Sequence, residues 1–334
     1  TLQDRGEMLP MWPDPKSVRL LHRRSTFASI PTLSRLLRRE KFDALISAQD
    51  HANIVAVLAK MLSRKKFPLI LTERLSLREV MKSRGWFRRV VLSRLRSWAY
   101  PRAEAIVANS QDGAREVESL LGWSSGQVHS IYNPTVSDSI SELAKEEVDD
   151  PWFKHGAVPV VLGLGRLEER KDFATLVRAF AIARASVECR LVIFGGGELQ
   201  DSLTQLSVEL GVGEHVRFEP FEHNPYKYLS RASLYVHSSR SEGLPNALIE
   251  AQACGIPTIS TDCPTGPREI LEDGKSGVLV PVGDHVEMAR AISQVLLDKD
   301  LAKKYVASSN EGLLRFKPVN AYAQYKKLID QVSM

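Results

Sequence analysis

Two glutamates with seven residues between them, Glu242 and Glu250, are the side chains best spaced for ligand chemistry. The segment that follows the first, Gly243-Leu244-Pro245-Asn246, leads into a predicted helix, and proline suits a first helical turn. The backbone N–H groups of residues 244–247 would lie unpaired at the positive end of the helix dipole, where they can bind a diphosphate. Carboxylates cannot contact phosphate favourably, but they accept hydrogen bonds from sugar hydroxyls. The pattern favours a nucleotide sugar; on spacing alone, solvated surface acids are an equal alternative.

Two glycine-containing turns follow predicted strands earlier in the chain. They are Gly163-Leu164-Gly165 and Gly195-Gly196-Gly197. In open α/β sheets ligands bind at the carboxyl ends of the strands, where both turns lie. Arg166 and Lys171 follow the first turn and offer a guanidinium fork and a compact positive charge for phosphate. The third glycine of a dinucleotide fingerprint is absent, so the first turn is weak evidence by itself, and a tight turn also explains the three consecutive glycines.

A regular alternation of β-rich runs and amphipathic stretches positions these residues. It predicts parallel sheets with helices on both faces, in two domains. A polar segment at 133–150, opened by Asn-Pro and without an apolar period, is expected to link them. Strands are predicted at 44–48, 68–72, 105–109, 127–131, 158–163, 190–194, 216–218, 234–237, 258–260 and 277–280, with a weaker signal at 17–22. Helices are predicted at 52–64, 76–98, 110–121, 172–185, 198–210, 245–253, 284–297, 301–314 and 319–332, with a weaker signal at 33–39.

Length and composition limit the classes of protein to which the chain can belong. It has 334 residues, of which 43% are hydrophobic and 25% charged. These values are typical of a soluble globular protein with two domains and exclude a disordered or fibrous chain. No run of 18 uncharged apolar residues occurs, so no membrane span is predicted. Three cysteines, Cys189, Cys254 and Cys263, form neither a disulfide framework nor a zinc pattern, which favours a reducing, cytosolic setting.

Charge is distributed unevenly between the two parts of the chain. Residues 1–135 carry 23 Lys and Arg against 12 Asp and Glu, whereas the remainder is net negative. The basic residues are densest between Arg78 and Arg102, where apolar residues recur at roughly helical spacing. Such a helix can contact an anionic membrane or a phosphate-bearing ligand, or simply be a solvated helix with an ordinary core face. No recognised nucleic-acid-binding module is present, so no nucleic acid is expected as a partner.

The motifs taken together resemble retaining glycosyltransferases of family 4, which have the GT-B fold. Glu242 and Glu250 match the two glutamates of the family's signature, which are likewise separated by seven residues. Gly165-Arg166-Leu167, the glycine turn at 194–198, and the segments 224–229 and 262–270 match other motifs in the expected order. The likeness runs from about residue 44 to the end and is strongest between 160 and 282. The variants at 224–229 and 265–270 most resemble bacterial enzymes of lipid-linked glycan or surface polysaccharide synthesis.

This resemblance implies an α/β chain with two Rossmann-like domains. An acceptor-side domain is expected at 1–140, a nucleotide-sugar-binding domain at 151–316, and a helix at 317–334 that crosses back to the first domain. The implied reaction moves a hexose or N-acetylhexosamine from a nucleotide diphosphate sugar, with UDP as the expected nucleotide, to a lipid-linked or polysaccharide acceptor. It retains the anomeric configuration and uses neither metal nor other cofactor. A cytoplasmic enzyme, peripheral to the inner membrane face through Arg78–Arg102, is expected.

The resemblance also implies a role for each candidate residue. Arg166, Lys171 and Glu242 would be catalytic. Arg166 and Lys171 would stabilise the leaving diphosphate, while Glu242 would contact the transferred sugar. Glu250 would hold the ribose hydroxyls. The donor would further be bound by Gly165, Gly197, Gly243, Leu244, Pro245 and Asn246, and a base pocket is expected near 221–223 and 232–234.

The sequence departs from the family pattern in its first part. The family opens with a strand and a glycine-rich loop, and neither is found before Ser17, so the first β-α-β of the domain is expected to be missing. Where the family often has a histidine after the strand at 68–72, this chain has Glu73-Arg74. Arg74 could replace it as a fixed charge but not as a base. His51 is the other acceptor-side candidate, and a purely structural histidine is as consistent with its position.

Two other functions fit the same motifs. Nucleotide-sugar epimerases share the fold and would interconvert two donors without an acceptor. A noncatalytic nucleotide-sugar-binding fragment would bind the donor without turnover. The context of the two glutamates favours transfer.

Overall fold

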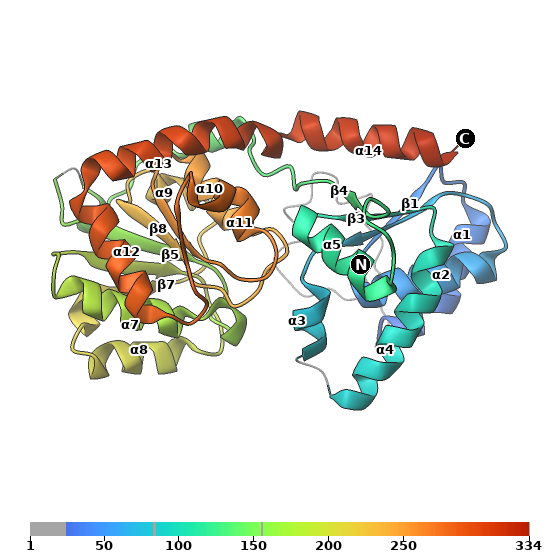
Figure 1. Ribbon diagram of the computed structural model, residues 1–334, viewed down its shortest axis with the longest axis horizontal. Coiled ribbons are helices and arrows are strands. Elements are labelled where there is room, and N and C mark those ends of the chain that lie inside the picture. The colour runs from blue at the N-terminus through green and yellow to red at the C-terminus, as the bar shows by residue number, and fades with distance from the viewer. Residues whose placement is uncertain (1–24, 83–84, 155, 334) are drawn as a thin grey trace. The chain divides into compact units, whose positions relative to one another are not determined.

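The computed structural model describes residues 25–82, 85–154 and 156–333, which divide into two compact units (Figure 1). The described part of the first unit contains residues 25–82, 85–109, 113–131 and 324–333, and that of the second contains 110–112, 132–154 and 156–323. The predicted strand at 17–22 lies outside the described residues. The segment 133–150, expected as a linker, belongs to the second unit.

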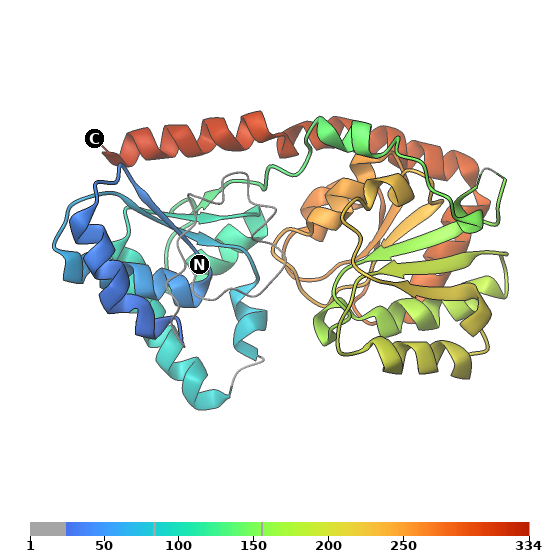
Figure 2. The same cartoon turned by 180° about the vertical axis from the view of Figure 1, so that it is seen from behind.

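The first unit is built on a four-stranded parallel sheet in the order β1-β2-β3-β4. Its strands are β1 (Leu45–Ala48), β2 (Leu69–Glu73), β3 (Ala105–Ala108) and β4 (His129–Ser130). Its helices are α1 (Ile30–Arg39), α2 (Asp50–Ser63), α3 (Leu77–Lys82), α4 (Trp86–Ala99) and α5 (Gln111–Leu121). All residues of β2 and β3 are buried, because helices cover the sheet. Figure 2 shows α1 lying beside α2 in this unit.

The single helix predicted at 76–98 is two helices. α3 ends at Lys82, and α4 begins after Gly85, which caps it with an extended backbone at φ −57° and ψ 149°. Glycine has the lowest helix propensity after proline, so it marks a preferred place for a helix to begin anew. Hydrophobic periodicity did not reveal this break, because the apolar residues on both sides keep a similar spacing.

The second unit is built on a six-stranded sheet in the order β10-β9-β8-β5-β6-β7, with all pairs parallel. Its strands are β5 (Val160–Leu164), β6 (Arg190–Phe194), β7 (Val216–Glu219), β8 (Leu234–His237), β9 (Thr258–Thr261) and β10 (Val278–Val280). Its helices are α6 (Ser139–Leu143), α7 (Phe173–Arg184), α8 (Gln200–Glu209), α9 (Tyr226–Leu229), α10 (Asn246–Ala253), α11 (Pro267–Ile270), α12 (His285–Leu297) and α13 (Lys299–Gly312). The last helix, α14 (Pro318–Ser333), begins in the second unit and ends in the first.

Alternate residues of the central strands enter two separate cores. On one face, Val161 of β5 packs in a cluster with α7, α8 and α12. On the other face, Val160 and Leu162 pack with α9 and α10. This is the alternation expected when successive side chains of a strand point to opposite faces and helices cover both. The doubly wound sheet inferred from the sequence is confirmed, and it is the fold that positions the site.

The order of the strands reverses at β5. From β5, the chain adds β6 and β7 on one side and then β8 on the other, so β5 and β8 are neighbours with a reversal between them. A crevice forms at such a reversal because the connections leave the two strands in opposite directions. Segments that follow β5 and β8 therefore lie where a ligand is expected.

The segment 133–150 contains helix α6, which its lack of apolar periodicity did not predict. Contacts with the rest of the second unit hold this segment in place. Val136 N donates to the Phe316 carbonyl at 3.0 Å, and Asn224 Nδ2 donates to the Leu143 carbonyl at 2.9 Å. These partners are distant in sequence, which is why local patterning could not identify them.

Candidate active site

The glycines after β5 and β6 allow two turns to pack backbone to backbone. Gly165 and Gly195 have φ values of 151° and 143°, a region that favours glycine. A Cβ atom on Gly195 would lie 2.0 Å from the Gly165 carbonyl oxygen, and one on Gly197 would lie 2.3 Å from that of Leu167. Leu167 N in turn donates to the Gly196 carbonyl at 3.0 Å. The glycines therefore bring the ends of β5 and β6 together beside the reversal.

Asp172 fixes the segment that carries the basic residues after β5. It adopts a left-handed backbone, and its carboxylate caps α7 by accepting from Thr175 N at 3.4 Å and also accepts from Thr175 Oγ1 at 2.9 Å. The loop after β8 binds this segment directly, with Ser238 Oγ donating to the Lys171 carbonyl at 2.8 Å. Arg240 N also donates to the Arg170 carbonyl at 2.8 Å. These hydrogen bonds join the segments after β5 and β8, which are about 70 positions apart in the chain, into one wall of the site.

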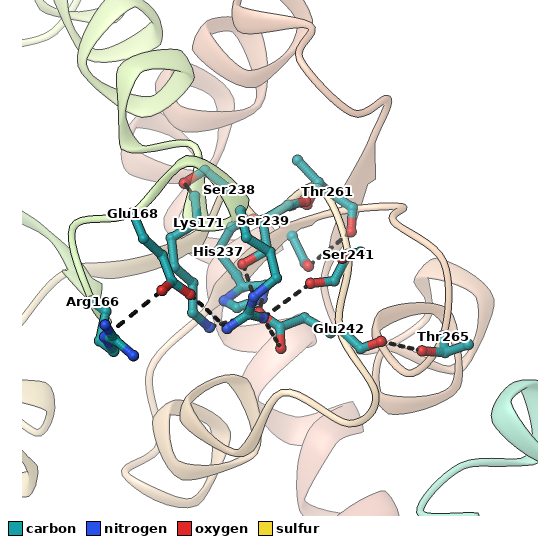
Figure 3. Close-up of polar contacts among 12 residues, drawn as sticks. Arg166, Glu168, Lys171, His237, Ser238, Ser239, Ser241, Glu242, Thr261 and Thr265 are labelled. Carbon is teal, nitrogen blue, oxygen red and sulfur yellow. Dashed lines mark hydrogen bonds and ion pairs between the residues drawn. The ribbon is translucent and has the colours of Figure 1, made fainter. Parts of the chain in front are cut away.

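The carboxylate of Glu242 is the centre of this wall (Figure 3). Its Oε1 lies 2.6 Å from Lys171 Nζ, and its Oε2 lies 3.0 Å from Arg170 Nη1. Ser239 Oγ donates to Oε1 at 2.8 Å. Glu242 is only 6% exposed, so two cations and a hydroxyl replace the lost water. Burial alone would raise the pKa of Glu242, but the hydrogen bond to His237 and the positive charges of Lys171 and Arg170 outweigh it and lower the pKa.

His237 lies beneath the same carboxylate at the end of β8. It is 3% exposed, and its Nε2 is 3.4 Å from Glu242 Oε1. Burial lowers the pKa of His237, an effect that the contact with Glu242 opposes only in part. The buried imidazole of His237 is therefore neutral, and it gives Glu242 a polar contact without adding a further charge.

A cavity of about 490 Å³ opens at the carboxyl ends of β5 and β6. Its walls bring together three of the predicted donor-site side chains, namely Arg166, Lys171 and Glu250, with the backbone of Gly165. Phe221 and Glu222 line it too, in the region where a base pocket was expected. Burial raises the pKa of Glu250, and the Tyr226 hydroxyl, which donates to its Oε1 at 3.4 Å, opposes the rise.

The remaining predicted donor residues lie near this cavity in different ways. Gly243, Leu244 and Pro245 lead from Glu242 into α10, whose start has no side-chain cap. The Asn246 side chain accepts from Asn133 Nδ2 at 2.8 Å and so holds the segment around Asn133 at the start of α10. Glu242 itself is placed behind Lys171, because Lys171 lines the cavity and Glu242 does not.

In the first unit, His51 and Arg74 line one cavity of about 130 Å³ at the carboxyl ends of β1 and β2. The structure therefore brings together the two predicted acceptor-side residues, which are 23 positions apart in the chain. Gln49 and Leu75 also line it.

Sequence reasoning missed Arg170 and His237 as members of the site. Arg170 reaches Glu242 because the loops after β5 and β8 are hydrogen-bonded to each other, whereas His237 ends β8, five residues before Glu242 in the same segment. The one signal that could have indicated Arg170 was its place beside Lys171 after a strand at the reversal. Within the described ranges, no group of three His, Cys, Asp or Glu residues is placed to hold a metal ion, and no helix combines the length and apolar character of a membrane span.

A doubly wound parallel sheet with its cavity at the reversal, preceded by a second parallel-sheet unit, defines the GT-B class of glycosyltransferases. The sequence matches the family described as "Glycosyl transferases group 1" over residues 144–311 and that described as "Glycosyltransferase Family 4" over residues 5–138. The chain belongs to the group 1 glycosyltransferase family, and it is a glycosyltransferase.

Two curated bacterial relatives show the range of the likeness. The chain is 30% identical over 285 residues to N-acetylgalactosamine-N,N'-diacetylbacillosaminyl-diphospho-undecaprenol 4-alpha-N-acetylgalactosaminyltransferase of Campylobacter jejuni, covering 84% of this chain and 75% of the relative. It is 33% identical over 211 residues to the lipopolysaccharide core biosynthesis glycosyltransferase LpsE of Rhizobium meliloti, covering 63% of this chain and 59% of the relative.

Solved structures of the same fold include HepE from Anabaena in complex with UDP, with a TM-score of 0.75 and 21% identity. The match covers 90% of this chain and 82% of HepE. The apo lipopolysaccharide outer core galactosyltransferase WaaB gives a TM-score of 0.70 and 23% identity, covering 92% of this chain and 80% of WaaB. The GT-B fold expected from the resemblance is confirmed.

Proposed function

We propose that this glycosyltransferase moves a hexose or N-acetylhexosamine from a UDP-sugar to a lipid-linked or polysaccharide acceptor, with retention of anomeric configuration and without a catalytic metal. The single observation that carries the donor part is the cavity at the sheet reversal, which Arg166, Lys171 and Glu250 line together. Two cations suit a diphosphate, and a carboxylate suits the hydroxyls of a ribose. The HepE structure, which was solved in complex with UDP, supports the choice of nucleotide.

The proposed chemistry follows from where charge develops. The bond between the sugar C1 and the diphosphate oxygen breaks, and the nucleoside diphosphate leaves with the electron pair. The acceptor hydroxyl oxygen forms the new bond to C1, and its proton passes to an oxygen of the departing diphosphate. Positively charged groups already in place stabilise the growing charge of the leaving group without a cost of reorganisation. In this proposal Lys171 and Arg166 supply that charge, while Glu242, which lies behind Lys171, holds its ammonium group at the cavity wall.

The acceptor part of the proposal has separate support. The Campylobacter relative is named for an undecaprenol diphosphate glycan, and the Rhizobium relative for lipopolysaccharide core synthesis. The first unit of this chain contains most of the basic charge and the cavity with His51 and Arg74. A cytoplasmic enzyme that works at a membrane surface would use these features to bind an anionic lipid-linked saccharide.

A donor panel tests the proposed function. The purified chain is incubated with UDP- and GDP-sugars and a polyprenyl-diphosphate-linked saccharide, in chelator, and the products are identified by mass and anomeric coupling constant. A glycosylated lipid with the donor's anomeric configuration is expected. Interconversion of two nucleotide sugars without acceptor would instead identify an epimerase. Donor binding without any product would identify a noncatalytic binder.

Replacing Glu250 with alanine should weaken donor binding by about 10- to 100-fold, because a hydrogen bond to a charged group contributes about 1.5–3 kcal/mol. Calorimetric titration with UDP measures this. Glu209→Ala, an exposed acid near the end of α8, is the matched control and should leave the affinity unchanged. An equal affinity for UDP in Glu250→Ala and the wild type would contradict the assignment.

Membrane contact is proposed through the beginning of α4. Trp86 and Phe87 are 73% and 71% exposed there, and α4 contains no acidic residue. Exposed aromatic residues beside arginines suit the interface of an anionic membrane. The opposite side of α4 packs through Leu92, Leu95 and Trp98 against the core of the first unit.

Removing two charges tests this contact. Arg88→Gln with Arg89→Gln should lower partitioning onto vesicles rich in anionic lipid by roughly 30-fold, at about 1 kcal/mol for each charge. Lys303→Gln with Lys304→Gln, exposed on α13, removes the same charge elsewhere and serves as the control. Equal partitioning of the two double variants in a sedimentation assay would refute the contact.

A further inference from the structure

A buried ion pair joins two helices of the first unit that lie side by side in Figures 1 and 2, α2 and α4. Arg96 donates from Nε to Asp50 Oδ1 at 2.8 Å and from Nη2 to Asp50 Oδ2 at 3.0 Å. Their side chains are only 2% and 5% exposed. The two-point contact matches one guanidinium to one carboxylate, so the charges of Arg96 and Asp50 neutralise each other within the pair.

A second buried carboxyl, that of Glu73, lies beside the pair. Glu73 ends β2 and is 4% exposed, and its Oε1 accepts from Asn53 Nδ2 at 2.7 Å and from the Tyr100 hydroxyl. The same hydroxyl is 3.5 Å from Asp50 Oδ1, so it lies between two acids and can donate its one proton to only one of them. An ionised Glu73 would leave two carboxylates sharing one guanidinium in the protein interior.

The protonated form of Glu73 is therefore favoured until the pH is close to neutral. Burial raises the pKa of Glu73 to about 7. The charge of Asp50 acts in the same direction, and the hydrogen bonds from Tyr100 and Asn53 and the charge of Arg96 oppose it. The other ionisable side chains that line the neighbouring cavity are Asp50, His51 and Arg74.

The cavity connects this cluster to the acceptor-side residues. Asp50 and Glu73 both line it, and each directly precedes a candidate residue in the chain, His51 and Arg74. The ends of β1 and β2 are hydrogen-bonded to each other, since Gln49 N donates to the Thr72 carbonyl at 3.1 Å. A change in the distance between the two acids would therefore move His51 and Arg74 relative to each other.

We propose that protonated Glu73 is a positioning residue that holds His51 and Arg74 in the arrangement that binds an acceptor hydroxyl. Ionised Glu73 is repelled by Asp50, and the ends of β1 and β2 separate. The inference rests on the proposed function, because it assigns the cavity to the acceptor. It adds that acceptor binding, and not donor binding, depends on the proton of Glu73.

Glu73→Gln tests the inference, because glutamine keeps an oxygen for Tyr100 and Asn53 but cannot ionise. The acceptor is a polyprenyl-diphosphate-linked N-acetylhexosamine, and KM and kcat are measured from pH 6 to 8.5. If only the protonated form binds acceptor, a pKa of about 7 predicts that the wild-type acceptor KM rises by about 30-fold over this range. The variant should show no such rise, and the donor KM should follow the same pH dependence in both.

Two further variants identify the titrating group. His51→Gln should bind acceptor less well but retain the rise in KM, because Glu73 is unchanged. Tyr100→Phe removes a hydrogen bond that favours ionised Glu73, so the rise should move to higher pH. A rise that persists in Glu73→Gln, or disappears in His51→Gln, would overturn the inference.

Thermal unfolding provides a readout that does not need transfer. Glu73 keeps its proton in the folded chain up to about pH 7 but loses it near pH 4.5 when unfolded. The wild type should therefore lose stability relative to Glu73→Gln as the pH rises from 4.5 through 7. The same slope in both proteins would overturn the inference, whereas absence of any wild-type transfer at all pH values would instead refute the proposed function.

Discussion

Lys171→Ala should lower kcat for sugar transfer by about 10²- to 10³-fold, the usual effect of removing one fixed group that stabilises charge in a transition state. Lys171 lines the cavity proposed to bind the donor, and its ammonium group already lies 2.6 Å from Glu242 Oε1. Its loss removes positive charge from the leaving diphosphate. It also leaves Glu242, which is 6% exposed, with Arg170 as its remaining cationic partner.

Three comparisons separate the chemical effect from a folding defect. Lys303→Ala removes an exposed lysine from α13 and should leave kcat unchanged. Lys171→Arg should recover part of the rate, because it restores a positive charge with a different shape. Circular dichroism melting of each variant reports folding independently. A well-folded Lys171→Ala protein with wild-type kcat would show that Lys171 does not act on the leaving group.

Arg96→Ala should lower the free energy of unfolding of the first unit by about 3–5 kcal/mol. The mutation removes the only guanidinium that makes a two-point contact with Asp50 in the described structure and leaves that carboxylate buried. An unpaired buried charge is much more costly than a complete pair, even though the pair itself adds little stability. Chemical denaturation followed by the fluorescence of Trp98, which lies near Arg96 on α4, would measure the loss.

The control for this variant is on the same helix. Arg94 is exposed, so Arg94→Ala removes the same charge without exposing a buried acid and should change stability by less than about 0.5 kcal/mol. Asp50→Asn combined with Arg96→Met should recover much of the loss, because it removes both charges. Equal unfolding midpoints for Arg96→Ala and Arg94→Ala would contradict the importance of the pair.

The sequence could predict the features that depend on neighbouring residues. Alternating β-rich and amphipathic runs predict the six strands and the longer helices of the second unit, because period and turn residues are local properties, but they do not predict the short helices α6, α9 and α11. The glycines after β5 and β6 predict turns at the ligand-binding edge, and the packing of the backbones explains why no side chain is tolerated at Gly195 or Gly197. The motif around Glu242 and Glu250 led to the family, which the comparisons confirm.

Local patterns were less informative where the structure depends on distant contacts. The helix predicted at 76–98 is interrupted at Gly85, whose low helix propensity is a local signal, although the apolar spacing on both sides does not show it. Helix α6 forms in a segment without apolar periodicity, which contacts Phe316 and Asn224, both distant in sequence. The polar composition of 133–150 does not contain that information.

The sequence by itself therefore determined the class of fold, the family and the segments that line the cavity proposed to bind the donor. Only the tertiary structure decided which charges meet. Lys171 and Glu242 are 71 positions apart, and Asp50 and Arg96 are 46 apart, yet each pair is in direct contact. The physical reason is that the energy of a buried charge depends on its partners and on the exclusion of water, and both are set when distant strands and helices pack together.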